Sequence, residues 1–309
     1  MSALNDSIIE TIIKTKKPYH PDFPPDYKAI RKDEIERNSV NPLPRGVHVT
    51  AKTHGNIRIL YTEKRLNPTD ESILYIHGGG FVMGSPESRT AFTGYAASKL
   101  GINVASPDYR LAPEHPFPAA PEDCLEAYRI LLHTYRPEKI TVIGESAGGN
   151  LVLVLLLMIK AAGLPMPGMT VSVSPCVQFD RELASYTENE ATEAMVTNLA
   201  DEVSDMYIGS RDESRLKNPL VAPLYGDFTG VSPVYLFVSD SELLRDDSYL
   251  MFEKLKKDGV ETKLFIRKGM IHAWITIPFI PESKKDIRII EKLISQKDAF
   301  DGKDVIRLN

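Results

Sequence analysis

The chain has 309 residues, of which 42% are hydrophobic and 26% charged, and these values are typical of a globular protein with a large core. A formal net charge of −5 supplies no broad basic field, so we expect no nucleic-acid partner. Two cysteines, Cys124 and Cys176, are too few for the disulfide framework of a small secreted domain, and we expect both to be free thiols.

The first 44 residues are predicted to be an N-terminal cap segment added to the core. Five apolar residues follow helical spacing and would form one stripe, and a proline-rich connector spans Pro18–Pro25. The stripe fits a helix packed on the core and a lid over a substrate pocket equally well. Charged residues interrupt Met1–Lys17, which therefore lacks the apolar core of a signal peptide and predicts a cytoplasmic protein. The stripe consists of Leu4, Ile8, Ile9, Ile12 and Ile13.

Short runs rich in β-branched residues alternate with helical stretches through the rest of the chain. Strands separated by helical crossovers predict a mostly parallel sheet with helices on both faces, which is an α/β fold. The alternation breaks at residues 179–231, which we interpret as a cap insertion between two parts of the core, 45–178 and 232–309. The predicted strands are Asn56–Tyr61, Ile73–Ile76, Asn103–Pro107, Ile140–Ile143, Met169–Val173, Val234–Val238 and Thr262–Ile266.

The first motif, His77–Gly80, reads His-Gly-Gly-Gly and directly follows the predicted strand Ile73–Ile76. Consecutive glycines let backbone N–H groups approach a substrate oxygen without a side chain in the way, and acyl transfer needs such donors for its oxyanion. We expect Gly79, Gly80 and the later Ala147 to form an oxyanion hole. A phosphate cradle is the alternative, but the Lys-Ser/Thr ending of a P-loop and the spacing of a dinucleotide fingerprint are missing.

The second motif, Gly144–Gly148, reads Gly-Glu-Ser-Ala-Gly between the apolar run Ile140–Ile143 and the helix-like stretch Asn150–Lys160. A nucleophile elbow requires this sequence of strand, sharp turn and helix, because the strained turn lifts the serine oxygen out of the sheet. We therefore predict Ser146 as a nucleophile. The apolar run Leu151–Ile159 is about half as long as the roughly 20 residues of a membrane span and predicts a buried helix.

These two motifs, with Tyr-Arg-Leu-Ala-Pro-Glu at Tyr109–Glu114 between them, resemble the hormone-sensitive-lipase family of α/β-hydrolases, and the resemblance covers most of the chain. The family's elbow reads Gly-Asp-Ser-Ala-Gly-Gly, so Glu145 stands in place of an aspartate, and we expect a local change in hydrogen bonding without a change of reaction type. The resemblance implies an α/β-hydrolase fold with a mostly parallel eight-stranded sheet and a helical cap. It also implies hydrolysis of short- to medium-chain carboxylic esters without a metal or an organic cofactor. We interpret Tyr109–Glu114 as scaffold.

The chain order of an α/β-hydrolase triad is Ser, then Asp or Glu, then His. Among seven histidines, His272 alone follows the penultimate predicted strand, and it lies in the loop after the last one. An imidazole there can accept the serine proton and return it to the leaving alcohol, so we predict His272 as the base. The other histidines are His20, His48, His54, His77, His115 and His133.

The loop after the predicted strand Val234–Val238 offers several carboxylates for the acid of the triad. The family pattern Asp-Pro-Leu-Arg-Asp, aligned on Leu244–Asp246, implies Glu242 as this acid. Register can slip by a residue or two in a loop, so Asp240 remains the alternative. Asp246 and the following Asp247 are expected to start a helix, where negative charge suits the helix dipole.

Together these expectations describe a serine carboxylesterase acting on a small ester. An amidase or peptidase using the same triad, and a non-catalytic receptor for a small ligand, remain as alternatives. The residues Phe81, Val82, Met83 and Trp274 either wall the substrate pocket or pack in the core. The strand Thr262–Ile266 is expected at the sheet edge, where it could pair across a two-fold axis in a homodimer.

Overall fold

The structure is a computed structural model, and it describes residues 10–11, 14, 26–39, 42–64, 69–180, 182–193, 197–295 and 302–309. The apolar stripe and the proline-rich connector expected near the N-terminus lie outside these residues, so the lid interpretation stays a prediction. Within the first 44 residues the structure describes helix α2 (Tyr27–Ser39).

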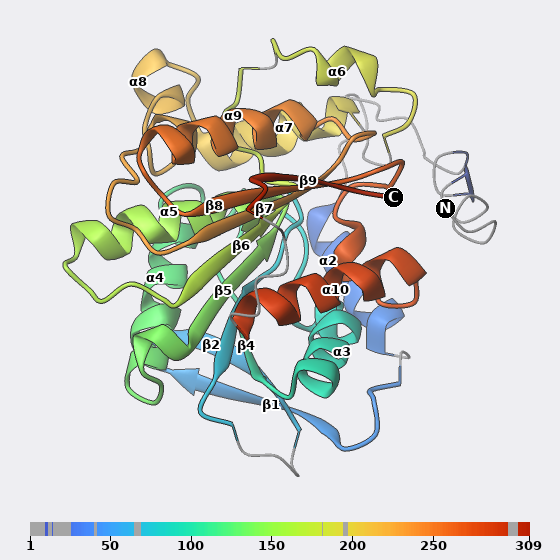
Figure 1. Cartoon of the computed structure of the whole chain (residues 1–309), viewed down its shortest axis with the longest axis vertical. Helices are drawn as coiled ribbons and strands as arrows, with labels where there is room; N and C mark the ends of the chain where they lie inside the picture. The colour runs from blue at the N-terminus through green and yellow to red at the C-terminus, as the bar shows by residue number, and fades with distance from the viewer. Residues whose placement is uncertain are drawn as a thin grey trace.

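A nine-stranded sheet runs through the centre of the described fold in the order β1-β2-β4-β3-β5-β6-β7-β8-β9 (Figure 1). Strand β2 pairs antiparallel with β1 and β4, and all other pairs are parallel. Parallel pairing brings the carboxyl ends of the central strands to one edge of the sheet, which is where open α/β folds bind their ligands. The strands are β1 (Val47–His54), β2 (Ile57–Lys64), β3 (Ser72–Ile76), β4 (Asn103–Pro107), β5 (Ile140–Glu145), β6 (Met169–Val173), β7 (Val234–Ser239), β8 (Thr262–Arg267) and β9 (Val305–Leu308).

The prediction of eight strands is wrong, because the described residues contain nine. Strands β1 and β9, which the apolar runs do not reveal, form the two edges of the sheet. Most residues of both strands are exposed or half-buried; β1 carries polar residues along its length, and β9 is only four residues long. An edge strand is held largely by backbone pairing with its neighbour, and such pairing leaves little trace in the side-chain pattern.

Strand β8 is therefore not the edge strand that the sequence suggested. Strand β9 pairs with it in parallel, from Leu264 opposite Val305 to Arg267 opposite Leu308. The expected homodimer through Thr262–Ile266 needs an unpaired edge, and the C-terminal strand already occupies most of it. This correction removes the physical argument for that dimer.

Helices cover both faces of the sheet (Figure 1). Apolar side chains of α3 and α10 form a cluster with one face, and those of α4, α5 and α9 form the main cluster with the other. Strand β7 shows the alternation that separates the two layers, because Phe237 joins the first cluster while Leu236 and Val238 join the second. The helices are α3 (Thr90–Leu100), α4 (Ala119–Leu132), α5 (Ala147–Ala161), α6 (Ser185–Glu188), α7 (Thr197–Ile208), α8 (Glu213–Leu216), α9 (Arg245–Lys257) and α10 (Pro281–Ile294).

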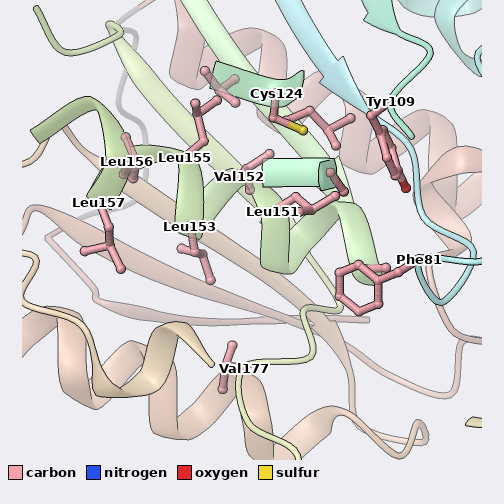
Figure 2. Close-up of a cluster of buried hydrophobic side chains, with 14 of the residues drawn as sticks. Phe81, Tyr109, Cys124, Leu151, Val152, Leu153, Leu155, Leu156, Leu157 and Val177 are labelled. Carbon is pink, nitrogen blue, oxygen red and sulfur yellow. The ribbon is translucent and has the colours of Figure 1, made fainter. Parts of the chain in front are cut away.

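Helix α5 is buried along almost its whole length, as its apolar sequence predicts (Figure 2). Leu151, Leu153 and Leu155 are fully buried, so successive turns contact protein on every side. Each such side chain contributes roughly 1.5–3 kcal/mol by leaving water. Cys124 of α4 belongs to the same cluster, and neither cysteine is in a disulfide. No helix in the described part of the chain is both long and apolar enough to cross a membrane.

Between β6 and β7 the chain forms α6, α7 and α8, within the range interpreted as the cap insertion. The ring of Tyr207 in α7 stacks on Phe81, with 3.8 Å between ring centroids. The hydroxyl of Tyr27 in α2 donates to Glu202 of α7 over 3.0 Å. Helices α2 and α7 thus contact each other, and α7 also contacts the loop that follows β3.

Candidate active site

Ser146 lies in a sharp turn between β5 and α5, with φ 58° and ψ −121°. A Cβ atom on Gly144 would come within 2.3 Å of the Gly148 carbonyl oxygen, and one on Gly148 within 2.1 Å of the Ile76 carbonyl oxygen. The turn is held by the Ser146 N–H, which donates to the Val173 carbonyl over 2.8 Å. A positive φ at a serine costs of order 1–3 kcal/mol, and here the surrounding backbone enforces it. The elbow therefore presents Ser146 at the carboxyl end of β5.

A second turn, formed by the glycines after β3, lies beside the elbow. Gly79 has φ 120° and Gly80 has φ 61°, which are conformations that residues with side chains rarely adopt. The Gly79 carbonyl accepts from the N–H of Met83 over 2.8 Å, which closes the turn. Gly79, Gly80 and Ala147 line the same pocket as Ser146. The N–H of Ala147 belongs to the first turn of α5, where backbone donors have no partner within the helix.

His77 supports this turn and stays uncharged. Its side chain is fully buried and stacks on Tyr109, with 4.3 Å between ring centroids. Burial lowers the pKa of His77 to about 3, against a hydrogen bond with the Gly78 carbonyl that favours the charged form. The Tyr109 hydroxyl donates to the His77 carbonyl over 2.8 Å, which agrees with the scaffold interpretation of its motif.

Glu145 connects the elbow to the glycine turn. Its buried carboxylate accepts the N–H of Gly78 over 2.7 Å and the Nε–H of Arg89 over 3.1 Å. A Cβ atom on Gly78 would come within 2.1 Å of that carboxylate and within 2.6 Å of the Glu145 backbone carbonyl oxygen, so only glycine fits at this position. The sequence predicts a local change in hydrogen bonding here but does not reveal Arg89 as the partner.

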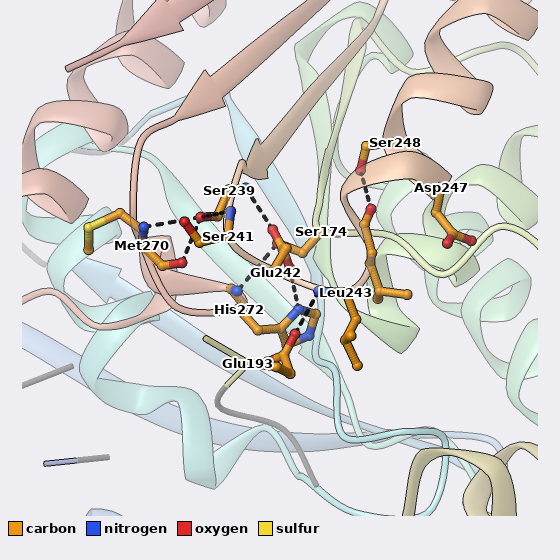
Figure 3. A network of polar contacts seen from close by, with 12 residues as sticks. Ser174, Glu193, Ser239, Ser241, Glu242, Leu243, Asp247, Ser248, Met270 and His272 are labelled. Atoms are coloured by element: carbon orange, nitrogen blue, oxygen red, sulfur yellow. Dashed lines mark hydrogen bonds and ion pairs between the residues drawn. The ribbon is translucent and has the colours of Figure 1, made fainter. Parts of the chain in front are cut away.

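Glu242 and His272 form a hydrogen-bonded pair across the loops after β7 and β8 (Figure 3). The Nδ1 atom of His272 lies 2.5 Å from Oε2 of Glu242. The other carboxylate oxygen, Oε1, accepts from the Ser174 hydroxyl over 2.8 Å and from the Ser239 N–H over 2.7 Å. Glu242 is thus held on both oxygens and orients the imidazole ring.

Asp240, the alternative acid, lies elsewhere in the loop. Its Oδ1 accepts from the Gly269 N–H over 2.7 Å and from the Ser241 hydroxyl over 2.8 Å. These contacts anchor the loop that leads to His272, and none of them reaches the imidazole. Asp246 and Asp247 lie in the first turn of α9, as expected.

His272 and Ser146 line the same pocket, and the second imidazole nitrogen, Nε2, is buried. This buried atom makes no hydrogen bond to Ser146 or to any other residue that the structure describes. Catalytic hydrogen bonds are often long in unliganded enzymes and tighten when substrate binds. Burial disfavours the imidazolium, but the hydrogen bond and charge of Glu242, helped by Glu193 and Glu145, raise the pKa of His272 to about 9.

The pocket has a volume of about 350 Å³ and is lined mainly by apolar groups. Phe81 and Met83 line it, whereas Val82 is buried behind the turn. Sequence reasoning missed the lining residues contributed by the cap insertion and by the loops after β6 and β7, because no local motif marks them. They include Cys176, Gln178, Phe179, Tyr186, Val203, Ser204, Leu243 and Leu244.

Trp274 does not line this pocket, so its expected place among the pocket residues is wrong and the alternative, packing in the core, is correct. The indole is fully buried in the cluster with α10, and its Nε1–H donates to Asp286 over 2.8 Å. Asp286 also forms a buried ion pair with Arg267 at the end of β8. Trp274 therefore anchors the chain just beyond His272. Among the described residues, no group of three or more His, Cys, Asp or Glu side chains is arranged to hold a metal ion.

Fold and site together define an α/β-hydrolase, and comparison with known proteins shows which family of α/β-hydrolases the chain belongs to. A family model described as alpha/beta hydrolase fold matches residues 73–276. An acetyl-hydrolase of Streptomyces hygroscopicus is 33% identical over 222 residues, which cover 71% of this chain and 73% of the relative. An esterase of Acinetobacter venetianus is 30% identical over 233 residues, which cover 73% and 75% of the two chains.

Solved structures agree with the sequence relatives. A crystal structure of an esterase from the bacterial hormone-sensitive lipase family superposes with a TM-score of 0.87 at 29% identity, covering 96% of this chain and 98% of the other. An esterase/lipase from an uncultured bacterium gives a TM-score of 0.88 at 29% identity, with coverage of 96% and 99%. The chain belongs to the hormone-sensitive-lipase family of α/β-hydrolases, and it is a carboxylic ester hydrolase.

Proposed function

We propose that this carboxylic ester hydrolase works through an acyl-enzyme on Ser146, with His272 as base and Glu242 as the acid that orients it. The observation that carries the proposal is the 2.5 Å contact between Glu242 and His272 Nδ1, which leaves Nε2 available to Ser146, a residue of the same pocket. A carboxylate on Nδ1 keeps the proton on that nitrogen, so Nε2 can act as a base.

In the first half-reaction, Nε2 of His272 accepts the Ser146 hydroxyl proton while Oγ attacks the ester carbonyl carbon. The negative charge that develops on the carbonyl oxygen accepts hydrogen bonds from the N–H groups of Gly79, Gly80 and Ala147. Collapse breaks the bond to the alkoxy oxygen, which takes the proton from His272 and leaves as an alcohol. Water then gives a proton to His272 and attacks the acyl carbon, and the acid is released as Ser146 regains its proton.

We further propose that the substrates carry short to medium acyl chains. A cavity of about 350 Å³ is at the lower end of the range for ligand sites, and its lining of Phe81, Phe179 and Val203 suits an apolar chain. The residues from 179–231 in this lining also support the interpretation of that insertion as a cap over the pocket. A cytoplasmic location stays a prediction from the sequence.

The serine assignment is tested with Ser146→Ala. The substitution removes one oxygen from a half-buried position, so we expect an unchanged melting temperature and a loss of at least about a thousandfold in kcat on p-nitrophenyl butyrate. Labelling by a fluorophosphonate should disappear in parallel. Residual kcat within tenfold of the wild type would contradict the proposal, and so would labelling of another residue.

A further inference from the structure

One segment of the cap insertion, residues 185–193, binds the loop that carries Glu242. Side chains of this segment hydrogen-bond to consecutive backbone groups of the loop, so the loop conformation depends on the cap. A loop of this kind has little regular structure of its own and needs such external partners for its backbone. The contacts run from Asn189 Nδ2 to the carbonyls of Asp240 (3.2 Å) and Glu242 (2.8 Å), from Thr192 to that of Ser241 (2.8 Å), from Ser185 to that of Leu243 (2.5 Å), and from the Leu243 N–H to Glu193 (2.8 Å).

Asn189 makes the central contact. One buried amide group donates both of its hydrogens, to the carbonyls on either side of Ser241. The two carbonyls belong to Asp240 and Glu242, so this amide fixes the peptide groups that set the direction of the Glu242 side chain. A buried carbonyl group without a hydrogen-bond donor is unfavourable, so the loop would shift if this amide were lost.

Glu193 combines a hydrogen bond with a charge. Its side chain is buried, accepts the N–H of Leu243, and lies beside His272 (Figure 3). Burying a second carboxylate close to Glu242 is unfavourable unless a positive charge lies between them. The imidazolium of His272 is that charge, and it forms during each half-reaction.

We propose that Asn189 and Glu193 are positioning residues, which hold the Glu242 loop against His272 and make the acid–base pair dependent on a docked cap. This inference rests on the proposed function of Ser146, His272 and Glu242. Neither residue touches the reacting atoms, and their effect reaches the substrate through the pair that they support.

The charges that face His272 come from three elements. Glu242 approaches from the loop after β7, Glu193 from the cap insertion, and Glu145 from the end of β5, where Arg89 neutralises part of its charge. Removal of Glu193 alone therefore leaves the two other carboxylates in place. The pH dependence of the reaction can then report on Glu193 separately.

The test compares Glu193→Gln with Glu190→Gln in the full-length enzyme. The glutamine at 193 can still accept the Leu243 N–H, so the variant removes the charge and retains the tether. Glu190 is exposed three residues earlier and provides the same loss of charge away from His272. We expect the rising limb of kcat/KM against pH to shift by about half a pH unit or more to lower pH in Glu193→Gln, and to stay in place in Glu190→Gln.

A second pair of variants tests the tether without a change of charge. Asn189→Ala should lower kcat about tenfold with little change in KM, because the pair is misplaced while the pocket remains. Thr187→Ala, in the same segment, removes an exposed hydroxyl that donates to the nearby Ala184 carbonyl and not to the Glu242 loop, and it should leave kcat unchanged. Circular dichroism and melting temperature check that each variant folds. If Glu193→Gln does not fold, the kcat of Asn189→Ala decides the test.

Ser146→Ala is measured beside these variants to separate the two levels of the proposal. If Ser146→Ala abolishes activity while Glu193→Gln keeps the wild-type pH profile and Asn189→Ala keeps kcat within twofold, the inference is overturned and the proposed function stands. If Ser146→Ala retains activity within tenfold of the wild type, the proposed function itself fails. A shifted limb in Glu193→Gln or a selective loss of kcat in Asn189→Ala supports the positioning role.

Discussion

At the scale of single residues, Glu242 differs from Asp240 in what its oxygens contact. Glu242 Oε2 reaches the imidazole, while Oε1 is held by Ser174 and Ser239. Asp240 instead accepts the N–H of Gly269, and this contact belongs to the backbone of the next loop. Two carboxylates two positions apart in the chain thus have separate tasks, one on the imidazole and one on the loop that carries it.

Glu242→Gln and Asp240→Asn should therefore differ sharply in activity. An amide at 242 cannot hold the imidazolium charge, and we expect kcat on a short aryl ester to fall about a thousandfold or more. An amide at 240 can still accept the Gly269 N–H, so kcat should stay within about tenfold of the wild type. Steady-state kinetics on both purified variants checks this, and a larger loss from Asp240→Asn would transfer the acid role to that residue.

Activity and stability are expected to respond to pH in opposite directions. The proposed base must be neutral, and the pKa of His272 is raised to about 9, so kcat/KM should rise as pH increases from 6.5 toward 9. For folding, a raised pKa means that the native state holds more protons than the unfolded state across this window. The contribution of His272 to stability is thus complete below pH 6.5 and is lost as pH rises through about 9.

Urea unfolding and ester hydrolysis, measured at the same series of pH values, test whether stability falls while kcat/KM rises. Glu242→Gln removes the main partner of the imidazolium, so it should shift the rising limb of any residual activity to lower pH and flatten the change in the free energy of unfolding. A wild-type limb centred below pH 6.5 would contradict the raised pKa.

At the scale of elements, the nucleophile elbow depends on the close approach of β3 to α5. A methyl group on Gly148 would lie 2.1 Å from the Ile76 carbonyl oxygen and 2.6 Å from that of His77, and these are backbone atoms that cannot rotate away. The helix would have to move away from the strand, and Ser146 at its start would move with it. Local geometry at the serine is therefore set by contacts between elements distant in the sequence.

Gly148→Ala should lower the free energy of unfolding by about 1–3 kcal/mol, because the added methyl overpacks the interface. Activity on a short ester should fall with it. Gly94→Ala is the matched control: it lies in α3, and its nearest neighbours are the ends of side chains, chiefly Leu43 at 3.1 Å. We expect that variant to lie within about 1 kcal/mol of the wild type in urea unfolding. Equal destabilisation by both substitutions would contradict the proposed clash.

At the scale of the whole molecule, the short strand β9 closes the edge of the sheet. It is four residues long and largely exposed, yet it pairs with β8 and covers an apolar strand that would otherwise offer unpaired backbone groups. Unpaired edges promote association with other chains. The C-terminal strand is thus a protective element as well as part of the sheet.

Deletion of residues 302–309 should expose this edge. We expect concentration-dependent association of the shortened chain in sedimentation velocity, beyond whatever state the full chain adopts, because Leu264 and Ile266 lose their pairing partners. Activity per folded molecule should persist, since none of the residues 302–309 lines the pocket and His272, in the loop after β8, is held by Glu242. An unchanged sedimentation profile would show that β9 does not protect the edge.

The sequence predicted the fold class and the positions of most core strands, because buried parallel strands read as apolar runs. It missed β1, whose polar residues carry no such signal, and β9, whose four residues are too few to show one. It left Trp274 open between the pocket and the core, since proximity in the chain to His272 does not specify the direction of a side chain. That direction depends on Asp286, twelve residues later, in α10.

By itself, the sequence determined the features that local chemistry dictates. The glycines of the two turns are readable because only glycine fits the required backbone and close contacts, and the serine is readable from its place between Gly144 and Gly148. Tertiary structure alone decided which carboxylate meets His272, which residues line the pocket, and how Asn189 and Glu193 of the cap reach the acid loop. Those relations join segments far apart in the chain, and packing energies summed over the whole fold select them.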